Sequence, residues 1–266
     1  QLGWYAVQVN ANDIAVMGAA PEFFTAALLF PAGATTPDAV ETCFEQIRGA
    51  CVELGVSWIG GHTEVTPAVT QPVVCGQMIG RVARSRLVTS SGGRRGDDLV
   101  LIGWLGIEGT AVLARERRAA LPPDLADRAA RFLFDPGIGI TRTARLACQV
   151  IRPHALHDPT EGGLATAVRE MATASGLGAQ IFDHPLPVAE PTRALCDRFG
   201  IDVLGLLSSG SLLVACDPVD TPALLAVLPA TRIGRLVPAA DGFRLGARPL
   251  PQFDRDELAR VLEGRC

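Results

Sequence analysis

The chain has 266 residues, a formal net charge of −4 and 48% hydrophobic residues. This content predicts a folded globular protein with one large domain or two ordinary ones, and it excludes an extensively disordered chain. The acidic balance argues against nucleic-acid binding by general electrostatics, and no apolar run approaches the roughly 18 residues that span a bilayer.

The first part of the chain is predicted to mix strands and helices. We expect a short strand at 5–9, a short helix at 14–17 capped by Asn10, Asn12 and Asp13, and a buried strand within 21–31. A helix should begin near Thr36 and Pro37 and end near Leu54, and strands at 56–59 and 73–82 should flank a polar connection. The chain enters this pattern without an initiating methionine, so we expect an N-terminal piece to precede Gln1.

Residues 84–97 are polar and glycine-rich, which predicts a linker. We therefore expect domains at 1–86 and 98–266, the second opening with a strand at 99–103. Helices are predicted near 109–118, 123–133, 141–151, 162–174, 190–198 and 254–263. Strands are predicted near 178–182, 211–216, 231–236 and 242–244.

The usage of cysteine and lysine restricts the chemistry. The seven cysteines form no CxxC pair, so a disulfide framework and a zinc ribbon lack support, and we expect core thiols in a reducing, cytoplasmic compartment. No lysine occurs among the 24 basic residues. A P-loop lysine, a Schiff-base lysine and a lysine general base are therefore excluded.

The most informative motif is HDPTEGGLA at residues 157–165. Asp158 and Thr160 precede Gly162 and Gly163, and an amphipathic run follows at once. Glycines allow close approach of a ligand to the backbone, and the start of a helix attracts anions. A carboxylate beside a phosphate is favourable only with a cation between them, so the motif indicates a Mg-nucleotide site. The alternative is a plain loop-to-helix junction with a capping aspartate.

Three further motifs carry weaker signals. In the segment from Asn10 to Gly18, Asp13 is a candidate metal ligand and Asn12 a candidate orienting group, with helix capping as the alternative. The GGHTE segment, residues 60–64, places two glycines and Thr63 at an expected strand end, where they suit phosphate contact or a tight turn. The loop at 103–110 is spaced by glycines and suits an anion, although Glu108 opposes one without a cation.

Taken in order, these segments resemble a known superfamily. VNANDIAVMGAAPEFF is similar to the VNDIxxxGAxPLFF segment of the aminoimidazole-ribonucleotide synthase (PurM-like) superfamily. GGHTE resembles its GGxT element, and GGRRGDDLVLIG resembles the opening of its second domain. HDPTEGGLA is similar to DPTRGGLA of the hydrogenase-maturation branch, which makes a cyanide ligand. The resemblance covers nearly the whole chain.

The resemblance implies an α+β, two-domain fold in an ATP-dependent enzyme. The N-terminal α+β domain would form a β-barrel across a homodimer, and the C-terminal domain would be an α/β layer. Asp13 and Asp158 would bind Mg²⁺, and Asn12, Gly61 and Thr63 would lie along the ATP phosphates, with His62 adjacent. Thr160, Gly162 and Gly163 would line the second-domain wall.

The chain departs from the family pattern in several places. The glycine-rich acidic segment that precedes the VNDI element, with its further metal-binding aspartates, is absent, which predicts a partial nucleotide site. His62 stands where several branches carry aspartate, and Glu108 lies where the maturation enzymes carry Asp-His-Gly. The chain ends in Gly264-Arg265-Cys266, whereas the cyanide-making branch ends in Pro-Arg-Ile/Val-Cys. Cys266 is therefore a candidate modified thiol, with an ordinary terminal residue as the alternative.

The leading functional prediction is ATP-driven activation of a carbonyl or carboxamide oxygen, nearest the hydrogenase-maturation branch and with a maturation protein as partner. Two alternatives stay open at this point. One is an aminoimidazole-ribonucleotide synthase or a thiamine-phosphate kinase relative. The other is a non-catalytic nucleotide-binding dimer, which would bind ATP without hydrolysing it.

Overall fold

The computed structural model describes residues 1–264 and has two compact units, the first Gln1–Leu87 and the second beginning at Val88. Residues 88–97, part of the expected linker, belong to the second unit by their contacts. Val88 is buried, and the backbone N–H of Gly93 donates to Ser175 Oγ at 3.1 Å. Among the residues described, no helix is long and apolar enough to cross a membrane.

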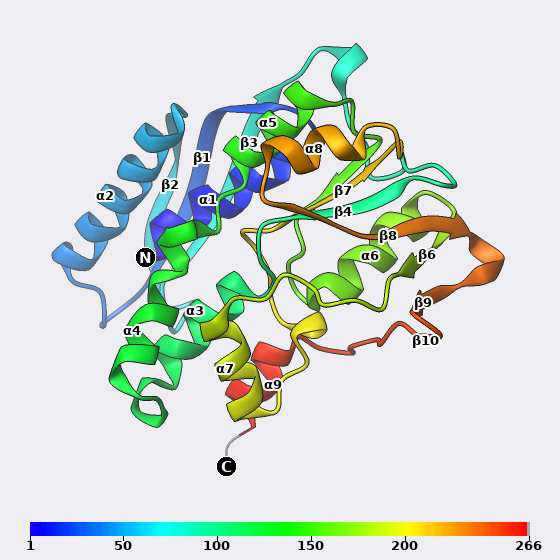
Figure 1. The fold of residues 1–266 in the computed structure, drawn as a ribbon. Helices are drawn as coiled ribbons and strands as arrows, with labels where there is room; N and C mark the ends of the chain where they lie inside the picture. Colours follow the sequence, from blue (N-terminus) through cyan, green and yellow to red (C-terminus); the bar gives the residue numbers. More distant parts are fainter. Residues whose placement is uncertain (265–266) are drawn as a thin grey trace. The chain divides into compact units, whose positions relative to one another are not determined.

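The first unit has a three-stranded sheet with strand order β2-β1-β3 and two helices (Figure 1). Strand β1 pairs in parallel with β2 and antiparallel with β3. The predicted strand within 21–31, helix near 36–54 and strand at 73–82 are confirmed. The elements are α1 (Leu2–Ala15), β1 (Ala20–Pro31), α2 (Pro37–Leu54), β2 (Ser57–Thr66) and β3 (Val73–Arg81).

Helix α1 corrects the predicted strand at 5–9. Its buried residues include Gly3, Val7, Ala11 and Ala15, which recur every four residues and form one face of a helix. The apparent alternation at 5–9 is a short section of this longer helical period. Asn12 and Asp13 therefore lie inside α1 and do not cap a following helix.

Strand β2 corrects the predicted polar connection. The strand continues through residues 60–66, so GGHTE lies within a strand and not at a strand end. The segment is polar because β2 is an edge strand whose residues are largely exposed on both faces. A polar edge strand lacks the apolar pattern by which sequence analysis finds strands.

The sheet of the first unit is buried on one face only. Phe24, Leu28 and Phe30 of β1 pack in one core cluster with Ile47 of α2. On the other face, Phe23 and Ile79 are direct cross-strand partners and remain 38% and 46% exposed. This second face is called the open face below.

The second unit has a seven-stranded mixed sheet, in the order β10-β9-β6-β8-β4-β7-β5, and helices around it. The strand pairs are antiparallel except β6 with β9, so the expected layer of helices and strands is built on a mainly antiparallel sheet. The strands are β4 (Asp98–Ile102), β5 (Ala155–His157), β6 (Leu177–Ile181), β7 (Leu212–Cys216), β8 (Ala230–Pro238), β9 (Phe243–Leu245) and β10 (Arg248–Pro249).

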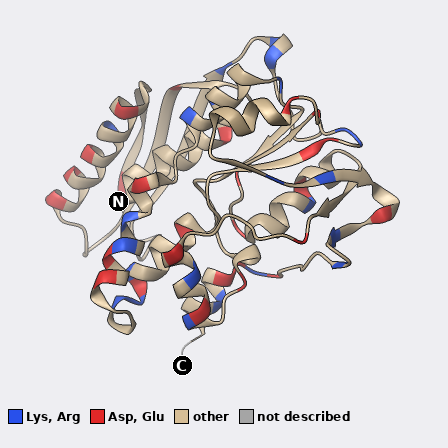
Figure 2. Ribbon diagram, in the orientation of Figure 1, with Lys and Arg blue, Asp and Glu red and all other residues tan. Residues whose placement is uncertain are grey.

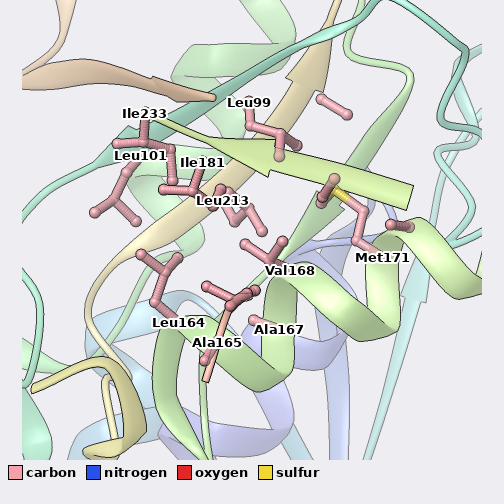
Figure 3. Close-up of a cluster of buried hydrophobic side chains, with 14 of the residues drawn as sticks. Leu99, Leu101, Leu164, Ala165, Ala167, Val168, Met171, Ile181, Leu213 and Ile233 are labelled. Atoms are coloured by element: carbon pink, nitrogen blue, oxygen red, sulfur yellow. The ribbon is translucent and has the colours of Figure 1, made fainter. Parts of the chain in front are cut away.

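The helices pack against the sheet and against one another. Helix α6 packs on one sheet face through Leu164, Val168 and Met171, which meet Leu99, Leu213 and their neighbours (Figure 3). A second cluster joins α3, α4, α7 and α9. The helices are α3 (Ile107–Glu116), α4 (Pro123–Arg131), α5 (Thr141–Val150), α6 (Gly163–Ala174), α7 (Glu190–Phe199), α8 (Thr221–Val227) and α9 (Glu257–Glu263). The predicted elements of this unit are confirmed in place, while β5, α8 and β10 were not predicted.

The six cysteines within the described residues are free thiols. Burial raises the pKa of Cys51 and Cys216 to about 11, and that of Cys196 to about 12. Cys75, on β3, is exposed. The prediction of core thiols is thus confirmed for Cys43, Cys51, Cys196 and Cys216.

Candidate functional site

The turn between β5 and α6 holds four of the predicted site residues. Asp158 is 6% exposed and Thr160 is exposed, and the turn ends at Gly162 and Gly163, with φ of +77° and +62°. A Cβ on Gly163 would lie 2.6 Å from the carbonyl oxygen of Leu204, so glycine is required there for space as well as for φ. The turn is therefore packed against the segment that precedes β7.

The backbone N–H groups of this turn are already hydrogen-bonded within the chain. Gly163 N donates to Thr160 O at 2.9 Å, and Gly162 N donates to Asp256 Oδ2 at 2.7 Å. These two donors are therefore not free to bind a phosphate in this conformation. Gly162 and Gly163 set the shape of the turn and the approach of a ligand to it.

A histidine links Asp158 to helix α6. His157 Nε2 lies 2.7 Å from Glu170 Oε2, and Nδ1 lies 3.8 Å from Asp158 Oδ1. Burial alone would lower the pKa of His157, but the contacts with Asp158 and Glu170 outweigh it and raise the pKa. The ring lies between the side chains of Asp158 and Glu170, and the contact with Glu170 fixes its orientation.

Sequence reasoning missed His157 and Glu170 as members of this turn. The motif includes His157, but the sequence analysis assigned it no functional role, although it directly precedes Asp158. Glu170 follows 13 residues later, and only the return of α6 past the end of β5 brings it to the histidine. Asp256 is 94 residues from Gly162, so no local pattern could have revealed it.

In the first unit, the predicted residues fall on two elements. Asn12 is fully buried and Asp13 is exposed, on consecutive positions of α1. Gly61, His62 and Thr63 lie on β2, the edge strand. Helix α1 packs on β3, β1 and α2, whereas β2 pairs with β1 on the side away from β3.

The glycine pair of β2 serves the sheet. A Cβ on Gly61 would lie 1.8 Å from the carbonyl oxygen of Ala26, its register partner on β1, shortly after the point where β2 has one residue, Ile59, more than β1. The carbonyl oxygen of Gly60 accepts hydrogen bonds from Thr25 Oγ1 and Trp58 Nε1, each at 3.0 Å. The tight-turn reading of GGHTE is therefore wrong. His62 lies 3.6 Å from Glu64, and both side chains are exposed.

The glycine-spaced loop before α3 and the terminal cysteine are the remaining predicted features. At the glycine-spaced loop before α3, Gly106 has φ of +71° and its N–H donates to Ser208 Oγ at 2.8 Å, while Glu108 is buried in the first turn. This loop is thus tied internally, with a carboxylate where an anion would approach. Cys266 lies outside the described residues.

Clusters of metal-binding side chains give no additional site. Within residues 1–264, no group of three or more His, Cys, Asp and Glu is arranged to hold a metal ion. Asp13 belongs to the first unit and Asp158 to the second.

Fold and site together define an α+β protein of two domains with a carboxylate–glycine turn at the head of a buried helix. Two family models match this chain: the N-terminal domain of AIR synthase related proteins over residues 1–82, and the C-terminal domain over residues 94–244. The chain belongs to the AIR synthase related family, and its fold is PurM-like.

Several similar proteins carry names that refer to hydrogenase maturation. The chain is 30% identical to carbamoyl dehydratase HypE of Cupriavidus necator over 239 residues, which are 88% of this chain and 65% of that protein. It is 29% identical to a putative hydrogenase expression/formation protein of Methanocaldococcus jannaschii, over 88% of this chain and 68% of that one. The chain spans about two thirds of the length of these relatives.

Solved structures agree with this family. Hydrogenase maturation protein HypE in complex with ATP superimposes with a TM-score of 0.81 and 25% identity, covering 96% of this chain and 80% of that one. A thiamine monophosphate kinase from Aquifex aeolicus has a TM-score of 0.78 at 19% identity, covering 93% and 81%, and this likeness concerns the fold alone.

Proposed function

We propose that this chain is the nucleotide-binding and catalytic part of an ATP-dependent enzyme that dehydrates a carboxamide during hydrogenase maturation. The observation that carries the proposal is the buried Asp158 carboxylate, set before the Gly162–Gly163 turn in a chain that family models match over both domains. The relatives named carbamoyl dehydratase and the ATP complex of HypE support the reaction and the nucleotide.

The proposed chemistry converts a poor leaving group into a good one. The carboxamide oxygen attacks the γ-phosphorus of ATP, the bond between that phosphorus and the bridging oxygen breaks, and ADP leaves. The phosphorylated oxygen then departs as inorganic phosphate while the nitrogen loses its protons, which leaves a nitrile. Phosphoryl transfer of this kind needs positioning and charge stabilisation more than a protein nucleophile.

Mg²⁺ is part of the proposal because the available donors suit it. Asp13 and Asp158 offer carboxylate oxygens, and Mg²⁺ is commonly held by one or two carboxylates together with substrate phosphates. With no lysine in the chain, the phosphate charge must be balanced by the ion, by arginine, by backbone N–H groups and by hydroxyls such as that of Thr160. Mg²⁺ would neutralise the phosphates and bring them to Asp158.

The proposed contacts along the phosphates are Asn12, Gly61, His62 and Thr63 in the first unit and Thr160, Gly162 and Gly163 in the second. Of these, His62, Thr63 and Thr160 present exposed side chains. Gly162 and Gly163 act through turn shape, since their N–H groups are bonded internally. Cys266 is proposed as the thiol that carries the carbamoyl group, in line with the terminal cysteine of the branch it resembles.

Calorimetry with Mg-ATP tests the nucleotide site. We expect micromolar binding that requires Mg²⁺, is weakened at least tenfold by Asp158→Asn, and is unchanged by Glu161→Gln, an exposed carboxylate of the same turn. Saturation at about 100 times the Kd should stabilise the fold by about 2.7 kcal/mol. If millimolar Mg-ATP gives neither heat nor thermal stabilisation, the proposal fails.

Mass spectrometry tests the reaction. With a carbamoyl donor and ATP, the full-length protein should gain a carbamoyl group on Cys266 and then lose one water. Cys266→Ala should abolish both mass changes, whereas Cys75→Ala, which removes an exposed thiol elsewhere, should leave them intact. ATP binding without any mass change would favour the non-catalytic nucleotide-binding dimer.

A homodimer is proposed from the open face of the first unit. Phe23 and Ile79 form an exposed apolar pair on a sheet face, and the edge strand β2 carries a further exposed apolar residue, Ile59. Apolar sheet faces and unpaired edges are normally covered by another chain or element. Sedimentation should show a dimer that Ile79→Asp dissociates, while Val52→Asp, at an exposed position of α2, leaves it intact.

A further inference from the structure

The start of the last helix is joined to the proposed nucleotide turn by one carboxylate. Asp256 caps α9, with Oδ1 accepting from Leu258 N at 2.7 Å, while Oδ2 accepts from Gly162 N at 2.7 Å. Asp256 also accepts a backbone hydrogen bond from Leu207. A single half-buried side chain therefore connects α9, the Gly162–Gly163 turn and the segment before β7.

Helix α9 has other attachments that do not involve the turn. Glu257 accepts from Asp202 N at 3.0 Å and pairs with Arg260, which donates to Gly200 O. Arg117, at the end of α3, donates to the carbonyl oxygens of Val261 and Leu262 at 2.9 and 3.2 Å. The helix carries both signs of charge along its length (Figure 2). It would therefore stay docked without the Asp256–Gly162 bond.

The turn, in contrast, depends on support from outside. Gly162 and Gly163 both have positive φ, and glycine has more backbone conformations to lose than any other residue. On the Gly163 side the turn is held by close packing against the Leu204 and Leu206 backbone. On the Gly162 side, Asp256 supplies the acceptor for the N–H.

The charge of Asp256 is compatible with this role. Burial raises the pKa of Asp256, and the hydrogen bonds from Gly162, Leu258 and Leu207 oppose that shift. These three N–H donors stabilise the carboxylate from the protein side. The N–H of Gly162 is therefore used to fix the backbone and is withheld from phosphate.

We propose that Asp256 is a positioning residue of the nucleotide site: through Gly162 it holds the Gly162–Gly163 turn in the conformation that binds Mg-ATP, without touching the nucleotide. This inference rests on the function proposed above.

The test compares Asp256→Asn with Glu257→Gln in the full-length protein. The asparagine keeps the shape and one oxygen acceptor, but it loses the second acceptor, whereas Glu257→Gln weakens an attachment of α9 that does not reach Gly162. We expect Asp256→Asn to speed hydrogen exchange of the Gly162 amide at least tenfold. It should also weaken Mg-ATP binding by about tenfold or more, because a hydrogen bond to a charged group is lost. The KM for ATP should rise more than kcat falls.

Each outcome separates the hypotheses. If Asp256→Asn and Glu257→Gln weaken Mg-ATP equally, the effect comes from docking of α9 and the proposal is refuted. If exchange at Gly162 accelerates while affinity stays constant, Asp256 holds the turn but does not position the nucleotide site, which also refutes it. If wild-type protein fails to bind Mg-ATP, the proposed function falls first, and unchanged exchange at Gly162 in the variant overturns the role of Asp256 in holding the turn.

Discussion

The substitution Gly61→Ala tests how β2 is held against β1. Both Gly60 and Gly61 have positive φ, at +140° and +146°, so alanine at either position is strained by about 1–3 kcal/mol. The two positions differ in the room that is available for a Cβ atom. A Cβ at Gly60 meets nothing within 4 Å, whereas a Cβ at Gly61 lies 1.8 Å from Ala26 O and 2.9 Å from Ala26 N.

The contact at Gly61 cannot be relieved by a side-chain rotation, because its partner is the backbone of a buried strand. The Cβ must move from 1.8 Å to beyond 3.0 Å, which separates β2 from β1 at this point. Overpacking of this kind costs a further ~1–3 kcal/mol. Gly61→Ala should therefore lose ~2–6 kcal/mol in total, a large share of the ~5–15 kcal/mol that a domain has.

Denaturant unfolding followed by tryptophan fluorescence measures the difference, since Trp4 and Trp58 both belong to the first unit. Hydrogen exchange of β1 amides assigns the loss to this sheet, because two units need not unfold together. Gly60→Ala is the matched control for backbone strain. Equal unfolding midpoints for the two variants would refute the close-approach argument.

Three further outcomes are expected. A maleimide at pH 8 should modify Cys75 in the folded protein but not Cys51 or Cys216, whose pKa values burial raises to about 11, and peptide mass spectrometry locates the label. The hydrogen bond and charge of Arg260 lower the pKa of Glu257 in the folded protein. This pair should therefore stabilise the fold at pH values above the unfolded pKa near 4.5, and the stabilisation should be lost as pH falls through the lower folded pKa. Glu257→Gln should flatten that part of the curve of unfolding free energy against pH. Asp97→Ala should cost about 2–3 kcal/mol in thermal denaturation, because Arg94 N and His154 Nδ1 both lose a buried partner at 2.8 Å, whereas exposed Asp124→Ala should leave the midpoint nearly unchanged.

The sequence analysis predicted correctly the elements that are marked by capping residues, by proline and glycine at helix ends, or by apolar runs. Helix α2 begins at Thr36, whose hydroxyl accepts from Ala39 N at 3.2 Å, has Pro37 in its first turn and ends at Gly55 with φ of +69°. Buried strands such as β4 and β7 were found as apolar runs. These features act over a few residues, so the sequence displays them directly.

The failures have a different physical origin. In α1, small residues every four positions carry the buried face, and five of its residues also fit a strand period. In β2, the strand state comes from pairing with β1 and not from its own composition. At the turn, Asp158, Gly162 and Gly163 were found by motif, but His157–Glu170 and Asp256–Gly162 depend on contacts that only the folded chain creates.

The position of Cys75 makes it a natural reporter group. It is the cross-strand partner of Ala27, four pairs along from Phe23 and Ile79; because side chains alternate between the faces of a sheet, this even spacing places Cys75 on the open face. In a twofold assembly formed through the open face, the same patch of each copy meets its equivalent, so Cys75 of both copies would lie within the covered surface. The alkylation rate of Cys75 should then fall as protein concentration rises. The rate of alkylation of this native thiol, measured at several protein concentrations, thus gives the association constant without an added tag or a surface mutation.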